Sequence, residues 1–156
     1  MARLKATFWH RNKFKLSGLL LLLPVYYLYQ SLHPSFPDSL QEQQIGAFKV
    51  APMPLDLESS YQHDGAYIKD FMVLFNQGNP EDIRQAFMSI GPAQLDLATL
   101  QDGDLGILHG SRYGKHVHAI APETFSANDR IWLTIENWQG ELNTISWSLP
   151  AQWLAH

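Results

Sequence analysis

The apolar residues form one long run near the amino end and many short runs after it. The long run, residues 16–32 (LSGLLLLLPVYYLYQSL), holds no charged residue. A helix over these 17 residues would be about 25 Å long, the lower limit for crossing a hydrocarbon core of about 30 Å. Tyrosines gather toward its far end, as they do at membrane interfaces. The pattern predicts a single transmembrane helix over residues 16–32.

A cleavable signal peptide is the main alternative, because it also joins a basic start to an apolar middle. Cleavage would require small residues soon after the run, whereas the chain continues YQSLHPSFPDSL. The sequence therefore favours an uncleaved anchor. A buried core helix is disfavoured, because the run has no polar face.

The short runs predict strands. Residues 33–44 lack apolar periodicity and are expected to form a tether, followed by one domain over residues 45–156. The expected strands cover residues 45–51, 67–75, 94–97, 105–109, 115–121, 130–137 and 141–148, and Pro52 and Pro54 are expected to end the first. Their spacing predicts a mainly β fold. We expect a small antiparallel β-sandwich, for which an immunoglobulin-like arrangement is one option.

One helix is predicted within this domain, over residues 79–90. Asn79 can cap its amino end, and Pro80 suits the first turn. Gly91 followed by proline would end it. Apolar residues recur on one face at helical spacing: Ile83, Ala86, Phe87 and Ile90.

The tryptophans and methionines are expected to have packing roles in the core and between strands. A two-residue turn at residues 139–140 would place Trp132 opposite Trp147 across the last hairpin. Met72 and Met88 fit core positions. Together with Met53 they are too scattered along the chain to indicate a methionine-rich Cu(I) cluster.

The distribution of charged residues predicts the orientation of the anchor in the membrane. Residues 1–15 carry five basic residues and no acidic one, whereas residues 33–156 carry six basic and fifteen acidic residues, a formal charge of −9. Positive segments stay in the cytoplasm, so residues 1–15 are predicted to be cytoplasmic and the β domain exported. An acidic domain has no electrostatic attraction for nucleic acid, and no such partner is expected.

The sequence contains neither cysteine nor a glycosylation sequon, which bears on the cellular compartment of the exported domain. Without cysteine there is no disulfide and no thiolate metal site, and no N-x-[ST] sequon occurs. Both absences favour a bacterial periplasm over a eukaryotic lumen. We therefore expect a single-pass protein of the bacterial inner membrane.

Candidate chemistry concentrates in residues 105–122 (LGILHGSRYGKHVHAIAP). His116 and His118 project from the same face of a strand. A turn of two or four residues would place His109 opposite His116, whereas a five-residue turn would turn it to the other face. Three imidazoles on one face predict a Cu or Zn site, the alternative being a solvated histidine face. Conceivable fourth ligands are Asp102, Asp104, Glu123 and His63.

The turn itself could bind an anion. Arg112 and Lys115 flank glycines whose N–H groups could contribute to an anion nest, although a solvent-exposed hairpin tip is the simpler interpretation. A P-loop is excluded, because only three residues separate the glycines and His116 stands where Ser or Thr should be.

No complete catalytic set is present, so we expect a protein that is not an enzyme. The leading hypothesis is a membrane-anchored accessory module of an envelope, transport or respiratory complex, in contact with an inner-membrane or periplasmic protein. The alternative is a histidine-based metal-binding protein or metallochaperone. Metal-assisted hydrolysis is a third, weaker hypothesis.

Overall fold

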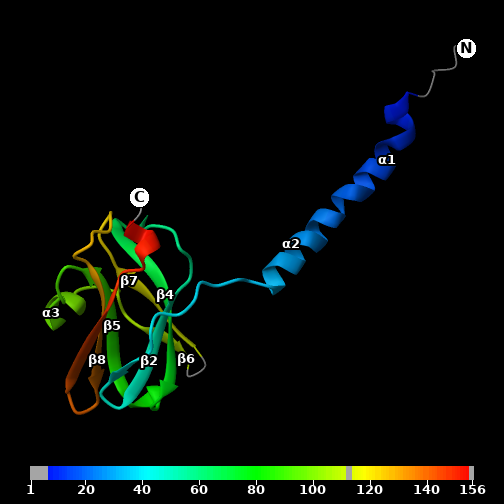
Figure 1. Ribbon diagram of the computed structural model, residues 1–156. Coiled ribbons are helices and arrows are strands. Elements are labelled where there is room, and N and C mark those ends of the chain that lie inside the picture. Colours follow the sequence, from blue (N-terminus) through cyan, green and yellow to red (C-terminus); the bar gives the residue numbers. More distant parts are fainter. Residues whose placement is uncertain (1–6, 112–113, 155–156) are drawn as a thin grey trace, which may run out of the picture. The chain divides into compact units, whose positions relative to one another are not determined.

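The structure, a computed structural model, describes residues 7–111 and 114–154. The chain divides into two compact units, Met1–Ser35 and Phe36–His156. The first is helical and the second carries all the strands of the described residues (Figure 1).

The first unit contains α1 (Phe8–Leu20) and α2 (Leu22–Leu32). Thr7 caps α1 by accepting a hydrogen bond from the backbone N–H of His10 (3.4 Å). Leu21 separates the helices with helical backbone angles (φ −68°, ψ −17°). The division falls next to the carbonyl of Leu20, which loses its helical partner because Pro24 has no N–H. No residue of α2 is buried.

The single apolar helix predicted over residues 16–32 is thus divided in two. Within residues 7–111 and 114–154, no helix is both long and apolar enough to cross a membrane.

The second unit is built mainly from strands. Its elements are β1 (Gln43–Ile45), β2 (Phe48–Pro54), β3 (Tyr61–His63), β4 (Ala66–Gln77), η1 (Pro80–Asp82), β5 (Ile83–Gly91), α3 (Leu97–Leu100), β6 (His109–Ser111), β7 (Gly114–Ile120), β8 (Arg130–Asn137), β9 (Leu142–Ser148) and η2 (Ala151–Leu154).

The described strands form one sheet in the order β1-β2-β4-β7-β5-β8-β9, with β3 paired to β4 and β6 paired to β7. All pairs are antiparallel except β5 with β7. The sheet nearly closes, because the two end strands approach each other: the Gln43 amide donates to the Ser146 carbonyl (3.1 Å), and the Trp147 indole donates to the carbonyl of Gln41 (2.6 Å).

The mainly β class is therefore confirmed, but the arrangement differs from the sandwich expected. A single curved sheet wraps around its own core instead of two sheets stacking face to face (Figure 1). The predicted tether ends inside the fold: Gln43 and Gln44 belong to β1, the Gln41 carbonyl contacts β9, and the Leu40 N–H donates to the Pro52 carbonyl (2.7 Å).

The core lies inside this sheet and is filled by alternate residues of its central strands. Phe71 and Val73 of β4, and Val117 and Ala119 of β7, are each at most 1 % exposed. Burying a Val or Phe side chain contributes about 1.5–3 kcal/mol. The intervening residues of β4 and β7 point outward.

The helix predicted over residues 79–90 is wrong. Only its first turn is helical: Asn79 caps η1, accepting from the Glu81 N–H (3.2 Å), and the chain then enters β5. Ala86, Met88 and Ile90 face the core at strand spacing. Apolar residues on both faces of this central strand imitate helical periodicity, because a strand buried on both sides loses its polar alternation.

Two other predicted boundaries move. The first predicted strand is divided by a turn at Gly46 (φ +54°), and β2 then continues through both prolines to Pro54. The pairing of β2 with β1 ends at Val50. Pro52 and Pro54 lie beyond it, so the N–H groups that they lack are not required for hydrogen bonds to β1. Residues 94–97, predicted as a strand, lead into α3, which Asp96 caps by accepting from the Thr99 N–H (2.9 Å).

The β8–β9 hairpin differs by one residue from the register predicted for it. Asn137 closes its turn by accepting from the N–H groups of Gln139 and Glu141 (3.0 and 2.9 Å), which gives a three-residue loop. One extra loop residue shifts every pair, so Trp132 lies opposite Ser146. Trp147 instead lies opposite Ile131, and both are buried in the core, as expected for a packing role.

Candidate metal centre

The hairpin of β6 and β7 places the predicted histidines. Ser111 pairs with Gly114, Gly110 with Lys115 and His109 with His116, which is the register of a two-residue connection. Gly110 makes this geometry possible. Its φ is +124°, and a Cβ at this position would collide with the carbonyl oxygen of Gly114. Of the alternatives that the sequence left open, the structure has the one that puts His109 and His116 on the same face.

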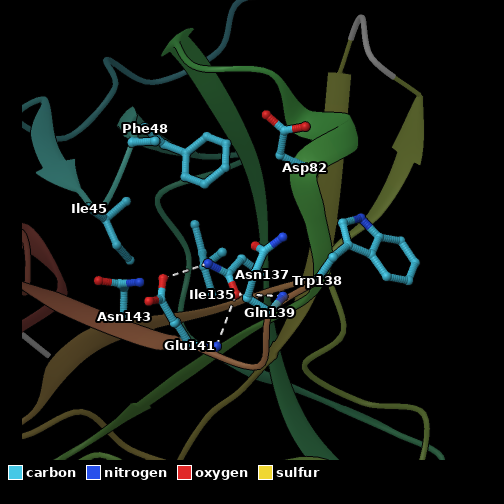
Figure 2. A pocket seen from close by; sticks show the side chains of 11 residues that line it. Ile45, Phe48, Asp82, Ile135, Asn137, Trp138, Gln139, Glu141 and Asn143 are labelled. Carbon is cyan, nitrogen blue, oxygen red and sulfur yellow. Dashed lines mark hydrogen bonds between the residues drawn. The ribbon is translucent and has the colours of Figure 1, made fainter.

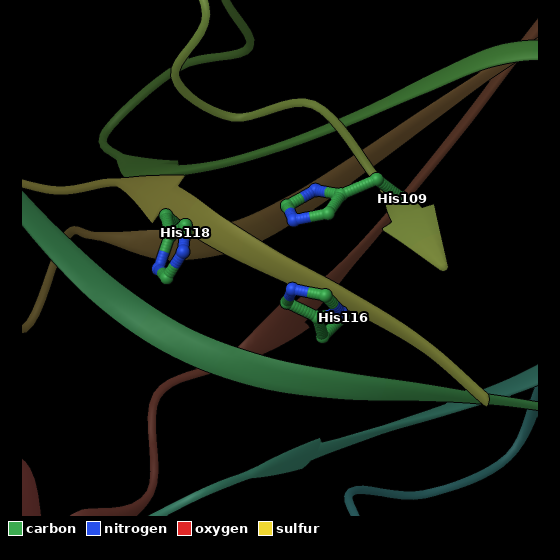
Figure 3. A group of neighbouring side chains, drawn as sticks. All are labelled: His109, His116 and His118. Atoms are coloured by element: carbon green, nitrogen blue, oxygen red, sulfur yellow. The ribbon is translucent and has the colours of Figure 1, made fainter. Parts of the chain in front are cut away.

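The three histidines form a compact group (Figure 3). One ring nitrogen from each of His109, His116 and His118 lies within 4.8 Å of the other two. The ring centroids of His109 and His116 are 3.8 Å apart, and His118 lies 5.9 and 6.0 Å from them. His109 is exposed, whereas the other two are half-buried. Three histidines that could hold a metal ion are therefore brought together.

Two of the rings are fixed by hydrogen bonds at Nδ1. His109 Nδ1 lies 2.9 Å from the backbone carbonyl of Ile107, and His118 Nδ1 lies 2.5 Å from Oδ1 of Asp70. A carbonyl or carboxylate partner requires the proton on Nδ1, which leaves the Nε2 lone pair available. Metal-binding histidines in proteins are oriented by partners of this kind.

Asp70 itself is held by a second residue. It lies opposite His118 in the β4–β7 pair, and its Oδ2 accepts a hydrogen bond from the Tyr61 hydroxyl (2.8 Å). Burial, together with the bond and charge of Asp70, raises the pKa of Tyr61 to about 12, so this hydroxyl stays a donor at neutral pH. The chain Tyr61–Asp70–His118 links β3, β4 and β7.

The electrostatics favour neutral imidazole at the centre of the group. Partial burial lowers the pKa of His116, and the nearby His109 and His118 lower it further, while Asp70 opposes them. Neutral imidazole is the form that binds metal ions.

A fourth histidine lies beside the group. The His63 ring is 6.1 Å from that of His118 and lies at 27° to it, but His63 is not within the 4.8 Å group. Nor are the other ligands considered from the sequence, Asp102, Asp104 and Glu123.

Only part of the predicted anion site falls within the described residues. Arg112 lies outside the described residues. Lys115 pairs with Val73 and precedes His116 in β7, so the two neighbouring side chains point to opposite faces of the sheet. Anion binding by these two residues stays a prediction.

A separate pocket of about 440 Å³ lies at the β8–β9 turn (Figure 2). Two of its polar side chains bond to each other: the Asn137 amide donates to the Glu141 carboxylate (2.8 Å) and also accepts from two backbone N–H groups. No histidine lines it. The pocket therefore adds nothing to the metal centre.

Comparison with known proteins places the whole arrangement in one family. The family model described as "Uncharacterised conserved protein UCP029505" matches residues 8–150. The chain belongs to this family. The match includes α1, α2, the strands from β1 to β9 and all three histidines. No curated protein and no solved structure matches the chain.

The three histidines could be identified from the sequence, but two of the residues that lie opposite them could not. Asp70 and Met72 lie in a run that the sequence shows only as an apolar strand, and Asp70 is its one acidic residue. A carboxylate inside such a strand was the available signal. Met72, expected in the core, instead lies half-buried opposite His116 on the outward side.

Proposed function

We propose that the β domain binds Cu²⁺ or Zn²⁺ through His109, His116 and His118. One observation carries this proposal: His109 and His118 are already held at Nδ1, by a carbonyl and by a carboxylate, so that Nε2 is presented as the ligand atom. Histidines that bind metal almost always donate the other ring N–H to a carboxylate or carbonyl of this kind.

The spacing of the rings suits a metal after a small closure. Zn–N bonds of 2.0–2.1 Å in a tetrahedral site would separate the ligand nitrogens by about 3.3 Å. The nitrogens now lie within 4.8 Å of one another. A closure of at most about 1.5 Å would therefore bring the three nitrogens to the spacing of a bound ion.

Carriage or sensing of the metal fits this site better than catalysis. His109 is exposed and the His118 side chain is 41 % exposed, so a partner's ligands can reach a bound ion. Three protein ligands also leave a coordination position for such an exchange. We infer that the domain passes its ion to, or signals its presence to, an inner-membrane or periplasmic protein, as part of an envelope, transport or respiratory assembly.

We further propose that residues 16–32 anchor the domain to a bacterial inner membrane with the amino end in the cytoplasm. The exposed leucines and tyrosines of α2 support this, because none of its residues is buried within the chain. The five basic residues before it and the acidic domain after it support the direction.

Equilibrium titration tests the metal site. Full-length protein in detergent, freed of metal, is titrated with Zn²⁺ and Cu²⁺ in competition with a chromophoric chelator. We expect a Kd of about 1 µM or below. The double variant H116A/H118A should lose this affinity and H33A should keep it, because His33 lies outside the β domain. Millimolar affinity, or affinity that survives in H116A/H118A, would overturn the proposal.

Location and partner need separate tests. An anchored protein should resist extraction by alkaline carbonate, and a reporter fused after His156 should report the periplasmic side. Extraction into the soluble fraction would contradict the anchor. Cross-linking in intact cells should then capture one membrane or periplasmic protein in wild type, and its recovery should change when metal is chelated.

A further inference from the structure

Two methionines continue the histidine group across the sheet. Met53 of β2 pairs with Met72 of β4, Met72 pairs with His116 of β7, and His116 pairs with His109 of β6. Directly opposite residues of antiparallel strands project from the same face, with Cβ atoms about 4.5–5.5 Å apart. One row of two thioethers and two imidazoles therefore crosses four strands, with His118 beside it.

These methionines differ from Met88, which is fully buried. Met53 and Met72 are half-buried, and neither belongs to the hydrophobic core or packs against it. Gly114 leaves space for the end of the Met72 side chain: a Cβ on Gly114 would lie 3.0 Å from the Met72 methyl carbon. The Met72 thioether thus has room beside the strand that carries His116.

We infer that the histidine site also takes Cu(I), with the Met72 thioether as a ligand and Met53 as the next ligand across the sheet. This inference rests on the metal function proposed above. Thioether sulfur is a soft ligand that selects Cu(I), whereas imidazole serves both Cu²⁺ and Zn²⁺. With the two thioethers, the site can therefore bind Cu(I) in addition to the Cu²⁺ and Zn²⁺ that the histidines alone would bind. The ion enters as Cu(I), and no electron transfer at the site is required.

Anaerobic titration separates the two ligand types. Full-length protein in detergent is titrated with Cu(I) against a chromophoric Cu(I) chelator, and with Zn²⁺ in parallel. In M72L, Cu(I) affinity should fall about tenfold and Zn²⁺ affinity should stay within about twofold, because only Cu(I) uses the thioether. M53L/M72L should lose more Cu(I) affinity. M88L, a conservative change in the core, should leave both affinities unchanged.

X-ray absorption gives a readout that requires no substitution. The Cu(I) form of the wild-type protein should show a sulfur scatterer beside nitrogen at the copper edge, and selenomethionine-labelled protein should show copper at the selenium edge. Copper surrounded by nitrogen alone would overturn the inference.

The Cu(I) and Zn²⁺ affinities of these variants distinguish a failure of the Cu(I) inference from a failure of the proposed metal-binding function. If M53L/M72L binds Cu(I) as wild type does while H116A/H118A loses Zn²⁺, the methionines are not ligands and the histidine site stands. If Cu(I) and Zn²⁺ affinities fall together in M72L, the methionine acts through packing and the inference fails. If the wild-type protein binds neither ion, both proposals fall.

Discussion

Strands β4 and β7 present two faces that differ in chemistry although they share one backbone. The core face is sealed: Phe71, Val73, Val117 and Ala119 are each at most 1 % exposed, and so is Lys69, a charged residue that lies opposite Ala119 on the same face. The outer face is polar and partly open. The core face consists of Lys69, Phe71, Val73, Val117 and Ala119, and the outer face of Asp70, Met72, His116 and His118.

The comparison shows how a small domain can combine rigidity with an exposed ligand set. Alternate residues of the same strands can serve core packing and metal binding separately, because side chains of a strand alternate between its faces. The sealed face fixes the backbone, and the fixed backbone holds the ligands of the other face at constant spacing. Stability and metal affinity should therefore respond to different substitutions.

The largest expected effect is on the core face. Phe71→Ala should lower the free energy of unfolding by about 3–5 kcal/mol, because it removes a fully buried ring and leaves a cavity. Denaturant unfolding of the metal-free protein measures this. H116A is the matched outer-face control and should change stability by less than about 1 kcal/mol. Equal losses in the two variants would contradict the division between the faces.

The next effect is on the outer face. Asp70→Asn should lower metal affinity about 10–100-fold, because it removes the carboxylate that orients His118. Asp64→Asn is its control, since the Asp64 side chain is 89 % exposed and, within the described residues, forms an ion pair only with His63. Chelator competition measures both variants, and similar affinities in D70N and D64N would remove Asp70 from the account.

A backbone change in the histidine hairpin should have a smaller effect. Gly110→Ala should weaken metal binding about tenfold, because the added Cβ meets the Gly114 carbonyl and displaces His109. Gly140→Ala supplies the comparison: Gly140 also has positive φ (+83°) but nothing lies within 4 Å of an added Cβ. Both variants should lose stability, and only G110A should lose affinity. An unchanged affinity in G110A would show that the hairpin register does not matter for binding.

The smallest effect concerns the hydroxyl behind Asp70. Tyr61→Phe should weaken metal binding about two- to tenfold, the equivalent of one net hydrogen bond of about 0.5–1.5 kcal/mol. The same substitution in a D70N background should add little, because the two residues act through one chain of contacts. Additive losses would mean that Tyr61 acts on the site by another path.

The local parts of the site could be predicted from the sequence. His116 and His118 share a face because they are two residues apart in a strand, and the glycines that bracket the turn mark a hairpin. The position of His109 depended on the length of one turn, which the sequence left open between two registers. The structure has the register that adds it to the group.

The residues that come from other strands could not be predicted in this way. Met53 was assigned outside a strand because Pro52 was expected to end it, and β2 in fact continues past both of its prolines. Its pairing with Met72 joins segments that are separated by a turn and by β3. Such pairs depend on sheet order, which no local pattern specifies.

Two local interpretations failed for the same physical reason. In β5, apolar residues on both faces imitated a helix, although burial on both sides of a central strand produces the same pattern. In the β8–β9 hairpin, the side chain of Asn137 closed a three-residue loop where two residues were expected. In both places a tertiary or side-chain contact outweighed the backbone preference that the sequence displays.

Nitrogen chemical shifts of the histidine rings test the central claim most directly. Full-length ¹⁵N-labelled protein in detergent is titrated with Zn²⁺ and followed by long-range ¹H–¹⁵N correlation. We predict that His109 and His118 carry the proton on Nδ1 before metal is added. The Nε2 signals of His109, His116 and His118 should then shift together, and the change should be complete at one equivalent of Zn²⁺. Shifts spread evenly over all seven histidines, or no shift in these three, would contradict it.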